Sequence, residues 1–126
     1  QNYIYELSIA CKLYTEKYPW SSDDQCAWSI NEGLKIQEYL PNQGYRVWHT
    51  ERQGPVGRNL FRHLVFMTYL NDVLDKGETE WYHQNLKVQP KKGLTVIWPA
   101  DWTFLHRGIP SETETKYIAT GWYSYD

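Results

Sequence analysis

The sequence predicts a mainly β fold, a jelly roll with one supporting helix near its start. Three observations predict it. About eight short apolar and aromatic runs are separated by turn signals, which is the pattern of a β-sandwich or barrel. Aromatic residues make up 17% of the chain, and such side chains fit the half-buried surface of a pleated sheet. A single stretch, at the start, has apolar residues at helical spacing. For eight antiparallel strands, a jelly roll is the natural arrangement.

The first expected element is a helix over residues 2–17. Ile4, Leu7, Cys11 and Tyr14 recur at helical spacing, and Pro19 cannot continue a helix. Residues 21–25 are polar and predict a loop. We therefore expect one domain over residues 1–126, with a helical support (1–28) and a jelly-roll core (29–126).

The expected strands begin at residue 34, and a turn or loop signal separates each from the next. Examples are Pro-Asn-Gln-Gly at 41–44 and Pro-Lys-Lys-Gly at 90–93, where Pro and Gly favour turns. Residues 52–59 carry two glycines and a proline and predict a loop. The expected strands are residues 34–39, 45–51, 64–70, 78–82, 86–88, 94–98, 104–108 and 116–123.

Composition narrows the possible partners and location. The net charge of −2 provides no basic field, so no nucleic-acid partner is expected. No apolar run has the length of a membrane span and no signal peptide is visible, so no membrane association is expected. Cys11 and Cys26 are too few for a disulfide framework and lack metal-ligand spacing. We expect both to be reduced, which favours a cytoplasmic location.

The chemistry is carried by His49 and Glu51, one residue apart within an expected strand. Successive strand side chains alternate between faces, so these two should point the same way, away from Thr50. An imidazole and a carboxylate on one face can hold a divalent metal, and His106 in a late strand is the candidate third ligand. Each signal alone has an ordinary explanation, since His-x-Glu pairs arise by chance and a lone histidine often belongs to a core.

A site with two histidines and one carboxylate leaves positions on Fe(II) open for a chelating 2-oxo acid and dioxygen. The far carboxylate of 2-oxoglutarate would then be buried and would need a cation. Lys116 is placed to meet it, ten residues after His106. On strand spacing, Ile118, Thr120 and Trp122 share the face of Lys116.

The order of motifs resembles the prolyl 4-hydroxylase-like branch of the Fe(II)/2-oxoglutarate-dependent dioxygenases. It is especially similar to the small versions found in cyanophages and marine bacteria, and the resemblance covers roughly residues 34–125. The matching residues are Tyr39, 44–45, 48–51 (Trp-His-Thr-Glu), 67–72 (Met-Thr-Tyr-Leu-Asn-Asp), 77–79 (Gly-Glu-Thr), Val88, 90–93, 98–99, 106–108, 116–117 and 122–123.

The resemblance implies a double-stranded β-helix, a form of jelly roll, with an assigned site. His49, Glu51 and His106 would be both the iron ligands and the catalytic centre. The implied co-substrate residues are Lys116 and Tyr69 at the distal carboxylate of 2-oxoglutarate, Tyr39 as a further hydrogen-bonding group, Trp122 as a wall of the site, and Thr79 nearby. The implied cofactors are Fe(II), 2-oxoglutarate and O2, with ascorbate as a stimulant.

The implied reaction hydroxylates a substrate C–H bond and releases succinate and CO2. A prolyl residue in a peptide or protein is the implied substrate, and a small molecule stays open. Two positions depart from the family pattern. Glu51 stands where Asp is commoner, and Lys76-Gly77-Glu78-Thr79 replaces Gly-Gly-Glu-Thr, but neither change removes a ligand.

The residues by themselves leave two other classes of function open. One is a catalytically silent jelly-roll binding module, which retention of all three ligands and Lys116 disfavours. The other is a Zn- or Mn-dependent hydrolase or isomerase of the cupin kind, which usually brings more histidines. His63 and His83 lack partners at ligand spacing and are expected to be structural or exposed, and Arg62 either binds substrate or is solvated at a strand start.

Overall fold

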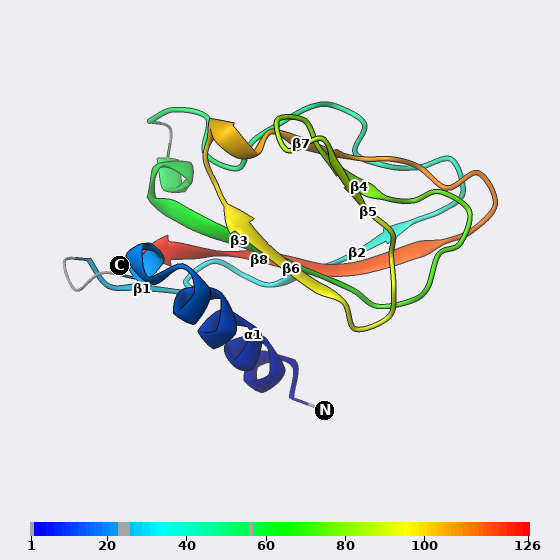
Figure 1. Ribbon diagram of the computed structural model, residues 1–126. Helices are drawn as coiled ribbons and strands as arrows, with labels where there is room; N and C mark the ends of the chain where they lie inside the picture. Colours follow the sequence, from blue (N-terminus) through cyan, green and yellow to red (C-terminus); the bar gives the residue numbers. More distant parts are fainter. Residues whose placement is uncertain (1, 23–25, 56) are drawn as a thin grey trace.

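The computed structural model describes residues 2–22, 26–55 and 57–126. Two antiparallel sheets face each other, and one helix lies against the outer face of the larger sheet (Figure 1). The mainly β prediction, with one N-terminal helix, is confirmed. The larger sheet contains β1 (Trp28–Ser29), β2 (Lys35–Tyr39), β3 (Arg62–Tyr69), β6 (Thr95–Pro99) and β8 (Lys116–Tyr125). The smaller sheet contains β4 (Thr79–Trp81), β5 (Leu86–Val88) and β7 (His106–Gly108).

Strand β8 organises the larger sheet because it pairs along its whole length. Its first half pairs with β2, its last two residues pair with β1, and β3 runs along its other edge, with β6 beyond β3. The smaller sheet has the order β5-β4-β7. Three short 3-10 helices connect these elements: η1 (Pro19–Ser22), η2 (Gly57–Phe61) and η3 (Trp102–Phe104).

Helix α1 (Tyr3–Lys17) begins where Asn2 caps it, since the Asn2 side chain accepts a hydrogen bond from the Tyr5 N–H at 3.2 Å. Leu7 is its buried anchor. Of the predicted loop at 21–25, the first two residues belong to η1, and residues 23–25 lie outside the described residues. Within the part of the chain that the structure describes, no helix is long and apolar enough to cross a membrane.

Alternation along β3 and β8 creates two cores, one on each face of the larger sheet. The inner face, which looks toward the smaller sheet, carries Val65 and Met67 of β3 and Trp122 of β8. The outer face carries Phe66, which packs in one cluster with Leu7 of α1. The helix therefore covers the outer face and leaves the inner face to the site.

One predicted strand is wrong. Residues 45–51 form no strand. Their β-type pairing is an isolated bridge between His49 and His106. The Gly108 N–H donates to the Tyr45 carbonyl at 2.8 Å, so from this bond to the His49–His106 bridge the segment advances four positions while β7 advances two. This mismatch breaks the ladder. The other seven predicted strands lie within two residues of the observed ones, and the short β1 was not predicted.

Candidate metal centre

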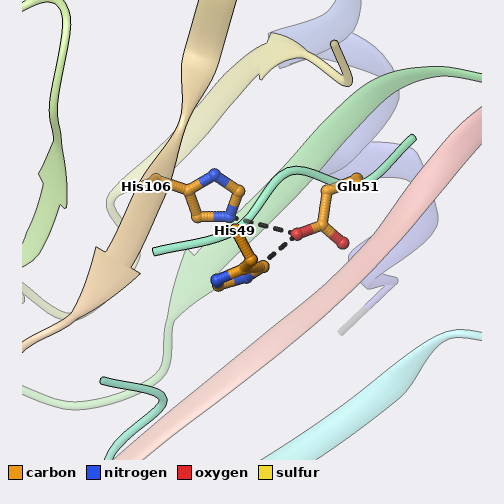
Figure 2. A group of neighbouring side chains, drawn as sticks. All are labelled: His49, Glu51 and His106. Atoms are coloured by element: carbon orange, nitrogen blue, oxygen red, sulfur yellow. Dashed lines mark ion pairs between the residues drawn. The ribbon is translucent and has the colours of Figure 1, made fainter. Parts of the chain in front are cut away.

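Three side chains that are distant in sequence converge between the sheets (Figure 2). Oε2 of Glu51 lies 3.2 Å from Nε2 of His49 and 3.1 Å from Nε2 of His106. One potential ligand atom from each residue lies within 4.8 Å of the others. The structure thus brings together the three residues that the sequence analysis selected as candidate ligands.

The isolated bridge explains why the two imidazoles meet. The His49 N–H donates to the His106 carbonyl and the His106 N–H to the His49 carbonyl, both at 3.0 Å. Residues directly opposite in an antiparallel pair project from the same face. Glu51 follows two residues after His49 and turns its carboxylate toward both rings.

Both histidines are oriented by the same local hydrogen bond. Nδ1 of His49 lies 2.8 Å from the Val47 carbonyl, and Nδ1 of His106 lies 2.9 Å from the Phe104 carbonyl. A carbonyl only accepts, so each Nδ1 carries a proton, and each ring in its neutral form has its lone pair on Nε2. Carbonyl partners of this kind fix the tautomer of metal-binding histidines.

The electrostatics favour positive charge at the point where these atoms meet. Burial on its own would raise the pKa of the Glu51 carboxyl, but hydrogen bonds from His106 and His49 hold that pKa far below its usual range. Burial opposes protonation of His49, yet its hydrogen bond to Glu51 gives a net rise in the imidazole pKa. Two Nε2 lone pairs and a carboxylate aimed at one point fit a divalent cation.

A cavity of about 400 Å³ contains the three side chains and extends to Lys116. Lys116 is 5% exposed, and its Nζ donates to the Gly77 carbonyl at 3.0 Å. A Cβ at Gly108 would lie 3.8 Å from Nζ, so the ammonium lies beside β7, the strand that carries His106. Burial lowers the pKa of Lys116 to about 8, against attraction from Glu78, which raises it.

Of the remaining predicted site residues, some line the cavity and one lies behind its wall. Tyr39 lines it and donates its hydroxyl proton to Gln37 Oε1 at 2.8 Å. Trp122 also lines it, and its role as a wall beside a bound co-substrate stays a prediction. Tyr69 is fully buried with its hydroxyl 2.6 Å from the Thr79 hydroxyl, and it is Thr79 that reaches the cavity. Direct contact between Tyr69 and a co-substrate stays a prediction.

The contacts that surround Glu51 were not predicted from the sequence. The Trp122 indole N–H donates to Glu51 Oε1 at 2.9 Å, and the Arg62 guanidinium lies over the Trp122 ring. These residues are far apart in the chain, so no local spacing signals them. His63 lies 2.7 Å from the Ser21 carbonyl, which agrees with a structural role, and His83 is exposed.

A jelly roll with two histidines and a carboxylate around one point is the arrangement of non-haem Fe(II) oxygenases. Comparison with known families agrees, because residues 34–124 match the model of the 2OG-Fe(II) oxygenase superfamily. The chain belongs to this superfamily, whose cofactors are Fe(II) and 2-oxoglutarate.

One relative in sequence carries a prolyl hydroxylase name. A protein of Acanthamoeba polyphaga mimivirus, provisionally named prolyl 4-hydroxylase, is 31% identical over 107 residues, which cover 73% of this chain and 44% of the mimivirus protein. This chain therefore spans less than half the length of that relative.

Among the solved structures that share the fold are two prolyl hydroxylases. The viral collagen prolyl hydroxylase of Paramecium bursaria Chlorella virus-1, in complex with 2-oxoglutarate, has a TM-score of 0.76 and 21% identity over 95% of this chain and 70% of its own. A Trichoplax adhaerens prolyl hydroxylase, solved with a hypoxia inducible factor peptide fragment, has a TM-score of 0.67 and 18% identity over 80% of this chain and 47% of its own.

Proposed function

We propose that this chain is an Fe(II)- and 2-oxoglutarate-dependent dioxygenase domain in which His49, Glu51 and His106 hold the iron. The observation that carries the proposal is the convergence of their ligand atoms within 4.8 Å, with both imidazole Nε2 atoms facing inward. When bound, iron and 2-oxoglutarate supply the oxidising chemistry that turns O2, 2-oxoglutarate and a substrate C–H into succinate, CO2 and a hydroxyl group.

The chain's own contribution is to bind and orient the co-substrate and to exclude water. Lys116 is proposed to pair with the distal carboxylate of 2-oxoglutarate, since its buried ammonium has three donors and one goes to Gly77. The Thr79 hydroxyl and the Tyr39 ring, whose centroid is 5.4 Å from Nζ, lie in the same part of the cavity. Ile118 and Met67 provide an apolar wall that keeps this region dry.

The proposed substrate is a prolyl residue in a peptide or protein. The names of the mimivirus relative and of the structural neighbours support this class, and the Trichoplax neighbour was solved with a peptide. Two of the residues that line the cavity, Lys35 and Gln53, are exposed, so the cavity opens to the surface beside them. A residue of a longer chain can therefore enter it.

The test is succinate release from 2-oxoglutarate with Fe(II) and ascorbate, with and without proline-containing peptides, followed by mass spectrometry. We expect release that requires iron and a peptide mass increase of one oxygen atom on proline. His106→Ala should abolish both. If the wild-type protein neither binds nor turns over 2-oxoglutarate, a catalytically silent binding module is the correct description.

A further inference from the structure

Glu51 uses its two carboxylate oxygens for different purposes. Oε2 faces the imidazoles of His49 and His106, while Oε1 accepts the hydrogen bond from the Trp122 indole at 2.9 Å. A glutamate has one more rotatable bond than the aspartate that is commoner at this position. Holding one oxygen therefore determines where the other points.

Trp122 is itself held by Arg62. The Cζ atom of Arg62 lies 3.6 Å from the centroid of the Trp122 ring, a close cation–π contact. Nη1 of Arg62 also donates to the backbone carbonyl of Glu51 at 3.1 Å. One guanidinium thus contacts both the backbone of Glu51 and the ring that binds its carboxylate.

A β-bulge gives Arg62 this orientation. Alternation along β3 would place Arg62 with Leu64 and Phe66 on the outer face, beneath α1. The register with β8 shifts between Arg62 and Leu64, so that the side chain of Arg62 reaches the cavity on the inner face. Bulges frequently redirect a side chain next to an active site.

Arg62 is in turn held by Glu32. This residue precedes the region that matches the family model, residues 34–124. Its carboxylate accepts two parallel hydrogen bonds, from Nε and Nη2 of Arg62, both at 2.9 Å. The two side chains are only 15% and 14% exposed, and a two-pronged pair of this kind is strong and directional. The Ser124 hydroxyl lies 3.4 Å from the same carboxylate.

We propose that Glu32 is a positioning residue for the metal centre, acting through Arg62 and Trp122 to hold Glu51 Oε2 toward the two histidines. Its charge has a specific consequence. Arg62 lies between two carboxylates, and its pair with Glu32 prevents it from turning to the carboxylate of Glu51 and competing with a metal. The inference rests on the proposed iron site, but it concerns residues of the chain and not the reaction.

The test compares metal affinity in Glu32→Gln, Trp122→Phe and a matched control. The control is Glu80→Gln, because Glu80 forms a similar pair with Arg107, which also lies over a tryptophan, Trp48, but makes no recorded contact with Glu51. Co(II) is the probe. Its Kd is measured by titration calorimetry and its ligand geometry by visible absorption at saturating metal. A thermal melt reports folding.

We expect Co(II) Kd to rise about tenfold in Glu32→Gln and in Trp122→Phe, as for other groups that orient metal ligands. The Co(II) spectrum should change in both, while Glu80→Gln should retain the wild-type Kd and spectrum. Glu32→Asp, which keeps the charge, should recover part of the affinity. A purely structural role for Glu32 would lower Tm without altering the Co(II) spectrum of the folded protein, and that outcome overturns the proposal.

If Glu32→Gln fails to fold, Trp122→Phe decides alone, because phenylalanine keeps a six-membered ring beneath Arg62 and removes the N–H donor together with the pyrrole ring that carries it. An unchanged Kd and spectrum in Trp122→Phe would then overturn the proposal. The failure of the iron site is distinguishable, since wild-type protein and His106→Ala would in that case bind Co(II) equally well.

Discussion

The ammonium group of Lys116 is buried before any co-substrate is bound, and this burial has a cost. The fall in its pKa from 10.5 to about 8 corresponds to roughly 3 kcal/mol against the charged form. Because the folded-state pKa is the lower one, the penalty is fully present below pH 8. It disappears as the pH rises from 8 to 10.5.

We therefore predict that Lys116→Met stabilises the protein while it abolishes 2-oxoglutarate binding. Methionine has a similar length and no charge to bury, so the free energy of unfolding at pH 7 should rise by about 1–3 kcal/mol. Urea unfolding and a 2-oxoglutarate titration measure the two effects. Lys87→Met, at an exposed position of β5, should change neither. A less stable Lys116→Met protein would show that the ammonium is already well compensated.

The same group predicts how 2-oxoglutarate affinity depends on pH. The proposed ion pair needs a protonated Lys116, whose pKa is about 8 in the folded protein. The Kd for 2-oxoglutarate should therefore rise above pH 8, approaching tenfold per pH unit, as the ammonium loses its proton. Lys116→Arg is the comparison, because a guanidinium remains charged and its Kd should stay flat between pH 7 and 9. A flat wild-type profile would contradict the ion pair.

The sequence could predict the residues of the candidate site that follow one another in a recognisable order. His49, Glu51, His106 and Lys116 are of this kind, and the structure brings them to one cavity. The sequence could not predict which residues hold the carboxylate of Glu51 in place. Trp122 is 71 residues from Glu51, and a contact across that distance depends on how strands pair and not on local spacing.

At the scale of elements, β3 and β8 meet through an unusually close contact. Gly121 of β8 lies opposite Phe66 of β3, and a Cβ on Gly121 would lie 2.5 Å from Phe66 Cζ. Phe66 is fully buried beneath α1, so its ring has little room to move. The glycine is thus required by packing on the outer face.

Gly121→Ala is accordingly predicted to lower the free energy of unfolding by about 1–3 kcal/mol, the usual cost of overpacking. Chemical denaturation measures it. Gly33→Ala is the matched control, because a Cβ at exposed Gly33 would have nothing within 4 Å. The folded Gly121→Ala protein should keep its Co(II) affinity, since the contact lies on the face away from the cavity. Equal stability of the two variants would mean that Phe66 can shift.

Elements with a regular pattern could be predicted, and those with irregular pairing could not. Residues 45–51 have the length of a strand and several β-favouring residues, but from the hydrogen bond at Tyr45 to the one at His49 this segment advances four residues where β7 advances two. A run of strand-forming residues carries no information on the partner's register. The bulge that turns Arg62 inward escaped prediction for the same reason.

In the whole molecule, the candidate metal centre lies between the segment of His49 and Glu51 and the smaller sheet, two parts that share few backbone hydrogen bonds. The segment carrying His49 and Glu51 is held to β7 by one isolated bridge and by the Gly108–Tyr45 hydrogen bond, whereas β3, β6 and β8 form continuous ladders. A metal bound to His49, Glu51 and His106 would cross-link that segment to the smaller sheet. Metal binding should therefore stabilise the entire fold as well as the site.

We predict that saturating Co(II) raises Tm and that His106→Ala removes the rise. A ligand at one hundred times its Kd adds about 2.7 kcal/mol to the stability of the folded state, which for a chain of this length is a shift on the order of 10 °C. Thermal melts with Co(II), and again after addition of a chelator, measure it. His83→Ala is the control because His83 is exposed and outside the cavity, and this variant should keep the full shift. An equal shift in His106→Ala would place the metal elsewhere on the protein, because two of the three ligands cannot provide the same affinity.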